Sequence, residues 1–374
     1  MQAFKRRRED PASSGVYLKL LLVILSTVFL ERQIGLASQA TQRGLSAKQT
    51  LDSPSISSLP LDKGRRGKLI NRHDYVAENQ PKDQQDPSLI FREPYRYVRP
   101  PRPSISQGER FANYKSRYHY TPPSKRQSGQ LAPECGNGPH FSNFFKLPYT
   151  LRSHLHEDWT IHRVFFQNKM PDNGTYVELG AFDGSTDSNT RFFDRCLGWK
   201  GLLIEGNLAS FDKMKEARPS AHKMSFAPTC SAEYEMVNKS VEFYKYPLTN
   251  SGQKGKAIIT YEGKPTVPVP CGPLGPVLED MFPGGQRINF FSLDVEGSEA
   301  LVLRTIDFER VHIDVLMVEV ENAHCLDDNC AVRQEVRSIM EQVGYKRYER
   351  IVRASDVYVR RGSEFELTNK TSAS

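Results

Sequence analysis

Two apolar segments of the sequence carry a carboxylate at or next to their last residue, and the first continues into a glycine-bearing turn. The run at 175–179 contains Glu178 and is followed by Gly180. The run at 201–205 ends in Glu205, 27 positions after Glu178. In an open α/β sheet a ligand binds at the carboxyl ends of the strands, and a glycine there lets the backbone approach it. An acid after the second strand is suited to accept hydrogen bonds from both hydroxyls of a ribose.

The turn after the first run favours a nucleoside without phosphates over a dinucleotide. Its glycines, Gly180 and Gly184, have the spacing Gly-x-x-x-Gly, which lacks the glycine that admits a pyrophosphate. S-adenosylmethionine is such a nucleoside, and its ammonium and sulfonium groups favour carboxylates as neighbours. The alternative, for each acid taken alone, is a residue that caps a turn.

A third apolar run, 290–293, leads into three carboxylates within six residues: Asp294, Glu296 and Glu299. Asp294 is the first candidate for the base that accepts a proton from an acceptor hydroxyl, with Glu296 and His324 as further candidates. The position of Glu299 in the first turn of the next helix is explained by the helix macrodipole. Clustered acids can bind a hard divalent cation, but no His or further Asp follows at ligand spacing, so we expect no metal.

Runs typical of strands and of helices alternate along the C-terminal two thirds of the chain. Such alternation implies βαβ units and a mostly parallel sheet. The expected strands are 175–179, 201–205, 222–226, 289–294, 315–321 and 356–360, and the expected helices include 208–216, 298–306 and 331–343.

Four ordered blocks of this region carry a resemblance to a known family. They read GTYVELGAFDGSTDSNTRFF, GWKGLLIEGN, FFSLDVEGSEALVLRTIDF and VLMVEVEN. Together they resemble the FkbM-type family of S-adenosylmethionine-dependent methyltransferases over about residues 150–362, and within it the membrane-anchored branch that includes Star. Two features depart from the family: Gly206 stands where relatives usually have Pro, and the apolar segment 226–230 offers no acid to clamp an adenine.

The resemblance implies a Rossmann-like class I methyltransferase fold, with a mostly parallel seven-stranded sheet and helices on both faces. It also implies S-adenosylmethionine as cofactor and methylation of a hydroxyl on a sugar, glycan or other small acceptor. The expected cofactor contacts lie in the turn after the first strand and at the ends of two later strands. With the neighbouring turn positions included, they are Glu178, Gly180, Ala181, Asp183, Gly184, Glu205 and Asp294.

The net charge of +7 belongs to the N-terminal third. Residues 1–132 carry 23 basic and 11 acidic side chains, a net of +12, whereas residues 133–374 carry 28 and 33, a net of −5. A nucleic-acid-binding protein needs its Lys and Arg on the folded domain, so we expect no nucleic-acid partner.

The N-terminal third predicts a membrane protein. A basic cluster at 5–8 precedes an apolar run, which we interpret as an uncleaved signal anchor, with a cleaved secretory signal as the alternative. This gives a single-pass type II protein of the endoplasmic reticulum or Golgi with a lumenal domain. The expected parts are a cytosolic tail (1–15), the anchor (16–36), a flexible lumenal stem (37–132), the methyltransferase domain (133–365) and a disordered tail (366–374).

The cysteines and glycosylation sequons agree with a lumenal address. The six cysteines are an even number, and Cys325 and Cys330 are close enough to close a small loop. Cys196 has the alternative of being a buried thiol. Sequons begin at the asparagines 173, 238 and 369.

A non-enzymatic function is the contrary hypothesis. Resemblance to the Star branch also implies that this fold can serve as a binding module in the trafficking of secretory cargo from the endoplasmic reticulum to the Golgi. A module that had lost the cofactor would be free to lose the acids at Glu178, Asp183 and Glu205, and all three are present.

Overall fold

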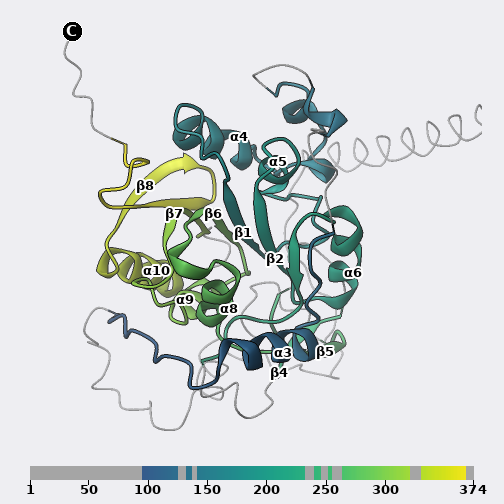
Figure 1. Ribbon diagram of the computed structural model, residues 1–374, viewed down its shortest axis with the longest axis vertical. Coiled ribbons are helices and arrows are strands. Elements are labelled where there is room, and N and C mark those ends of the chain that lie inside the picture. Colours follow the sequence, from purple (N-terminus) through teal and green to yellow (C-terminus); the bar gives the residue numbers. More distant parts are fainter. Residues whose placement is uncertain are drawn as a thin grey trace, which may run out of the picture. The chain divides into compact units, whose positions relative to one another are not determined.

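The fold is described from a computed structural model (Figure 1), in which helices and strands alternate along the C-terminal part of the chain. The residues that the structure describes are 95–124, 132–136, 141–231, 240–245, 252–254, 263–320 and 330–367.

The central sheet has seven strands in the order β3-β2-β1-β6-β7-β9-β8. Strands β3, β2, β1, β6 and β7 run parallel, and β9 is antiparallel to both β7 and β8. The chain moves outward from β1 through β2 to β3 and then returns to the other side of β1 with β6, so the strand order reverses between β1 and β6. A ligand cleft is expected at such a reversal, outside the carboxyl ends of the strands. The strands are β1 Thr175–Leu179, β2 Lys200–Ile204, β3 His222–Met224, β6 Ile288–Leu293, β7 Ile313–Glu319, β8 Tyr345–Val352 and β9 Ser355–Arg360.

Helices cover both faces of this sheet because successive side chains of each strand point to opposite faces. In β1, Tyr176 packs in one apolar core with residues of α4, α5 and α6, and Val177 packs in the other with residues of α8, α9 and α10. These helices are α4 Glu157–Ile161, α5 Arg191–Arg195, α6 Leu208–Ala217, α8 Leu274–Met281, α9 Glu299–Leu303 and α10 Ala331–Gln342.

The predicted mostly parallel α/β sheet is confirmed. All six strands expected from the sequence are present, with each end within two residues, and α6, α9 and α10 lie where helices were expected. Strands β8, β4 and β5 were not expected. β4 (Ser240–Tyr244) and β5 (Thr266–Pro270) form a separate antiparallel pair beside the sheet. The short helical turns are Pro133–Cys135, Phe144–Lys146, Tyr149–Leu151, His162–Phe166 and Pro283–Gly285.

Part of the predicted stem is packed against the domain. Helix α3 (Gln107–Arg117) begins at Ser106, whose side chain accepts a hydrogen bond from the backbone of Glu109 while the Glu109 side chain accepts one from Ser106. Tyr114 is 2% exposed, and the Arg110 guanidinium donates to both carboxylate oxygens of Asp280 at 2.8 and 2.6 Å. A flexible stem is therefore the wrong description of residues 95–124, because buried aromatic side chains such as Tyr114 hold them on the domain.

The remaining N-terminal predictions fall on residues outside the described ranges. In the part of the chain that the structure describes, every helix is too short or too polar to span a bilayer. The expected cytosolic tail and the anchor at 16–36 lie before residue 95, so both remain predictions.

Disulfides join Cys135 to Cys196 and Cys230 to Cys271. Cys196 is thus a disulfide cysteine rather than the buried thiol that the sequence left open. Cys330 is disulfide-bonded as well, and its expected partner Cys325 lies outside the described residues.

Candidate functional site

Two adjoining hollows lie at the carboxyl ends of β1, β2 and β6. The larger hollow has a volume of about 390 Å³, and the smaller one has a volume of about 70 Å³. The residues that line both hollows are Leu179, Gly180, Phe182, Asp294 and Glu296. The hollows therefore meet where the turn after β1 faces the loop after β6, at the expected reversal of strand order.

Glu178 lies in β1 on the wall of the larger hollow and is 3% exposed. Its carboxylate accepts hydrogen bonds from the Ser188 hydroxyl at 2.8 Å, the Asn189 backbone N–H at 2.6 Å and the Thr190 hydroxyl at 2.6 Å. Burial raises the pKa of Glu178 despite the Arg218 guanidinium 3.8 Å away. Glu178 thus fixes the segment 188–190, and Ser188 and Asn189 also line the larger hollow.

The turn after β1 depends on glycine. Gly180 has a φ of 81°, and a Cβ at this position would lie 1.8 Å from the backbone carbonyl oxygen of Asp294. Only glycine permits this approach between the turn and the loop after β6. Asp183 closes the turn by accepting hydrogen bonds from the backbone N–H groups of Ser185 and Thr186 at 2.9 and 2.7 Å.

Five of the expected cofactor contacts lie at the hollows and two do not. Glu178, Gly180, Ala181 and Asp294 line the larger hollow, and Glu205 lines the smaller one. Asp183 and Gly184 line neither hollow. They shape the turn instead, because a Cβ at Gly184 would lie 2.8 Å from the Arg218 side chain.

Glu205 directly follows β2 and is 8% exposed. One carboxylate oxygen accepts a hydrogen bond from the Phe182 backbone N–H at 2.8 Å, and the other accepts one from the Asn207 backbone N–H at 2.7 Å. Burial raises the pKa of Glu205 to about 7. Each oxygen retains capacity to accept a further hydrogen bond. Glu205 is therefore held in place while it remains able to bind a diol.

The structure explains why glycine, rather than the proline of its relatives, stands at position 206. A Cβ at Gly206 would lie 2.4 Å from the Phe243 ring, which also lines the smaller hollow. The glycine thus lets an aromatic ring of β4 pack over the end of β2.

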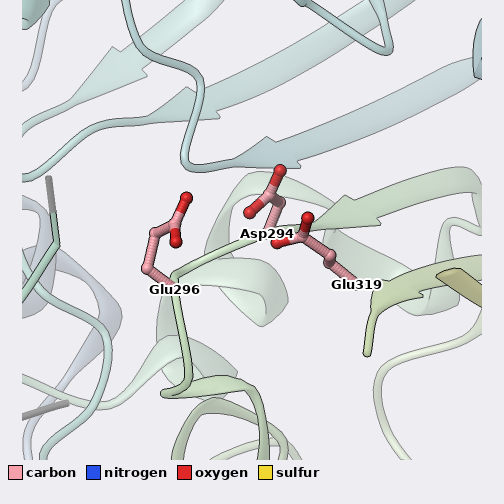
Figure 2. A group of neighbouring side chains, drawn as sticks. All are labelled: Asp294, Glu296 and Glu319. Atoms are coloured by element: carbon pink, nitrogen blue, oxygen red, sulfur yellow. The ribbon is translucent and has the colours of Figure 1, made fainter. Parts of the chain in front are cut away.

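Three carboxylates cluster between the ends of β6 and β7. Figure 2 shows Asp294 between Glu296 and Glu319, and each residue offers an oxygen within 4.8 Å of the others. Burial and the negative charges of Glu319 and Glu296 raise the pKa of Asp294 well above its usual value. Asp294 therefore binds a proton more tightly than an exposed aspartate does, and the geometry of the cluster is compatible with a cation.

Sequence reasoning did not identify Glu319 as a site residue. The predicted strand ended at residue 321, whereas β7 ends at Glu319. Parallel pairing places Leu293 opposite Val318, so the residue after each lies at the same edge of the sheet. The signal was therefore the register of two neighbouring strands.

Glu299 has a different role from the predicted one. It is 1% exposed, and one carboxylate oxygen accepts hydrogen bonds from the backbone N–H groups of Val295 and Gly297, both at 3.1 Å. Burial raises the pKa of Glu299 to about 7. Glu299 thus fixes the loop after β6, and an interaction with the helix dipole is not its main contact.

The larger hollow is also lined by residues that the sequence did not suggest as site residues. His154 and Asp187 are hydrogen-bonded at 3.1 Å, and Arg353 comes from the turn between β8 and β9. The acidic residues that line this hollow are Glu157, Glu178, Asp187, Asp294, Glu296 and Glu319. Such a lining favours a cationic or neutral ligand over an anionic one. His324, the third candidate base, lies outside the described residues.

The comparison with protein families supports a methyltransferase domain. The family described as "Methyltransferase FkbM domain" matches residues 178–347, from β1 into β8. The expectation of an FkbM-type domain is confirmed for this range, and the match carries no support for the membrane-anchored branch. The FkbM family typically uses S-adenosylmethionine.

The comparisons with curated proteins and with solved structures add little to the family match. No curated protein matches the sequence. Among solved structures, the chain is similar to a fibrillarin pre-rRNA processing protein of Methanococcus jannaschii, with 12% sequence identity and a TM-score of 0.26. The similarity covers 52% of this chain and 70% of that one and is too weak to bear on the site.

Proposed function

We propose that this protein is an S-adenosylmethionine-dependent methyltransferase that methylates a hydroxyl of a sugar, glycan or other small acceptor. The position of Glu205 is the observation that supports this function most strongly. Two backbone N–H groups hold its carboxylate at the wall of the smaller hollow, where both oxygens can accept from the two hydroxyls of a ribose.

The two hollows together suit the shape of the cofactor. Its nucleoside would lie at Glu205, and its amino-acid part would pass Gly180 into the acidic larger hollow, where carboxylates match its ammonium and sulfonium charges.

The acceptor would bind in the larger hollow beside Asp294. S-adenosylmethionine, when bound, would supply an electrophilic methyl group on a cationic sulfur, and S-adenosylhomocysteine would leave as the bond from sulfur to the methyl carbon breaks. Asp294 would accept the proton of the acceptor hydroxyl, whose oxygen forms the new bond to the methyl carbon. Because burial and the neighbouring charges of Glu319 and Glu296 raise the pKa of Asp294, its carboxylate is a stronger base than an exposed aspartate.

A lumenal setting is part of the proposal. Disulfides such as Cys230–Cys271 favour an oxidising compartment, and the sequon asparagine Asn173 is exposed. With the anchor expected at 16–36, the domain would face the lumen of the endoplasmic reticulum or Golgi, where glycans are available as acceptors. A Star-like role in cargo trafficking is the alternative, and cofactor binding distinguishes the two.

Isothermal titration of the full-length chain with S-adenosylmethionine tests the proposal. We expect one site per chain, and transfer of labelled methyl to a glycan mixture that Asp294→Asn abolishes while cofactor binding is retained. Glu309→Gln is the matched control, because this carboxylate lines neither hollow and should leave both properties unchanged. A wild-type chain that binds no cofactor would exclude the enzyme and leave the binding module.

A further inference from the structure

The smaller hollow is lined by two buried hydroxyl groups that have no hydrogen-bond partner among the described residues. They belong to Ser210 and Ser298, and each residue is 1% exposed. Buried hydroxyls are almost always hydrogen-bonded, since desolvation without a partner is costly. Two such groups in one hollow point to a ligand that supplies the partners.

Neither serine side chain is used by the helix in which it lies. Ser298 is at the N-cap of α9, where a serine oxygen normally accepts a hydrogen bond from the first turn of the helix, but its side chain makes no such bond. Ser210 is in the first turn of α6, and its hydroxyl has no hydrogen-bond partner among the described residues. Both hydroxyls are therefore available to a ligand in the smaller hollow.

Much of the remaining wall of the smaller hollow is apolar, and two of its polar side chains, Thr229 and Gln253, are hydrogen-bonded to each other at 3.0 Å. Phe226, Ala227 and Pro228 follow β3, and Phe243 comes from β4. None of these side chains offers a donor or an acceptor to the polar edge of a purine. Ser210 comes from α6 and Ser298 from the loop after β6, so the two hydroxyls reach the hollow from different elements.

We propose that Ser210 and Ser298 form the polar part of a purine-binding subsite, in place of an acidic residue after the third strand. The subsite extends the proposed function, since the purine is the adenine of the cofactor. A hydroxyl both donates and accepts, so the pair can serve ring nitrogens and the exocyclic amine. The aromatic and proline side chains then contact the faces and edges of the ring.

If the two serines form this subsite, replacing either one with alanine should affect the stability of the protein and its affinity for the ligand in opposite directions. Replacing such a serine with alanine removes a desolvated hydroxyl, so the ligand-free protein should be as stable as the wild type or more stable. The same change removes a hydrogen bond to the ligand. A merely structural role would lower stability and leave the affinity unchanged.

The test compares Ser210→Ala and Ser298→Ala with the wild type in the full-length chain. S-adenosylhomocysteine is the probe, the dissociation constant is measured by titration calorimetry, and the melting temperature is measured without ligand. Ser363→Ala is the matched control, because its hydroxyl is also buried and has no partner among the described residues, yet it lines neither hollow. We expect each test variant to bind about three- to tenfold more weakly without a lower melting temperature, and the control to bind like the wild type.

Two results would overturn the subsite alone. One is wild-type affinity in both test variants, and the other is a fall in affinity that accompanies a lower melting temperature. A wild-type chain that binds neither S-adenosylhomocysteine nor S-adenosylmethionine would overturn the proposed function and the subsite together.

Discussion

The affinity for S-adenosylhomocysteine should rise with pH because Glu205 must be ionised to accept from both ribose hydroxyls. Burial raises the pKa of Glu205 to about 7 in the ligand-free protein. The carboxylate is then about one tenth ionised at pH 6 and about nine tenths ionised at pH 8, so the apparent dissociation constant should fall roughly tenfold over this range. At pH 6 binding should also release about one proton, which titrations in buffers of different ionisation enthalpy measure directly.

Two glutamine variants assign this pH dependence to one residue. Glu205→Gln removes the titrating group, and it also places an amide N–H₂ against one of two backbone N–H donors, so affinity should be low and independent of pH. Glu299 titrates in the same range but lines neither hollow. Because a single oxygen of Glu299 accepts both of its hydrogen bonds, Glu299→Gln can keep them, and the tenfold dependence should persist. A flat wild-type profile, or the same slope in Glu205→Gln, would refute the reasoning.

Three further changes probe the framework of the site. Asp194→Asn leaves the fully buried Arg218 without its closest counter-charge and should lower the free energy of unfolding in urea by about 3 kcal/mol, whereas an unchanged value would contradict this. Gly180→Ala would press a methyl group against the Asp294 carbonyl and should weaken S-adenosylhomocysteine binding more than tenfold, so retained affinity would show that this contact is dispensable. Arg110→Ala removes the bidentate hydrogen bonds to Asp280 that hold α3 on the domain, so the backbone amides of α3 should exchange hydrogen faster than in the wild type. Unchanged exchange rates would show that other contacts hold α3 in place.

The parallel part of the sheet was predictable because β1, β2, β6 and β7 are largely apolar and each ends in, or is followed by, an acid or a glycine. β1 and β6 are buried along their whole length, and most of their residues are apolar. β8 was missed because it is the edge strand, and its partly exposed sequence, YKRYERIV, contains no apolar run. Polar residues at an edge give no periodic signal that separates a strand from a loop.

The N-terminal segment was unpredictable from its own composition. Its residues 95–124 are rich in basic side chains, and only their contacts with the domain reveal the buried positions Tyr114 and Tyr118. The candidate site was predictable where a residue lies at the end of its own strand, as Glu205 and Asp294 do. It was not predictable where a residue's place in the site depends on the register between two strands, as for Glu319. It was also not predictable for Ser210 and Ser298, whose hydroxyl groups are recognised only because they are buried without a partner among the described residues.

A crystal structure of the protein with S-adenosylhomocysteine tests the central claim most directly. The ribose hydroxyls should lie within about 2.7–3.0 Å of the two carboxylate oxygens of Glu205, with the amino-acid part of the ligand in the larger hollow beside Asp294. A ligand bound elsewhere, or a ribose that makes no contact with Glu205, would contradict the account.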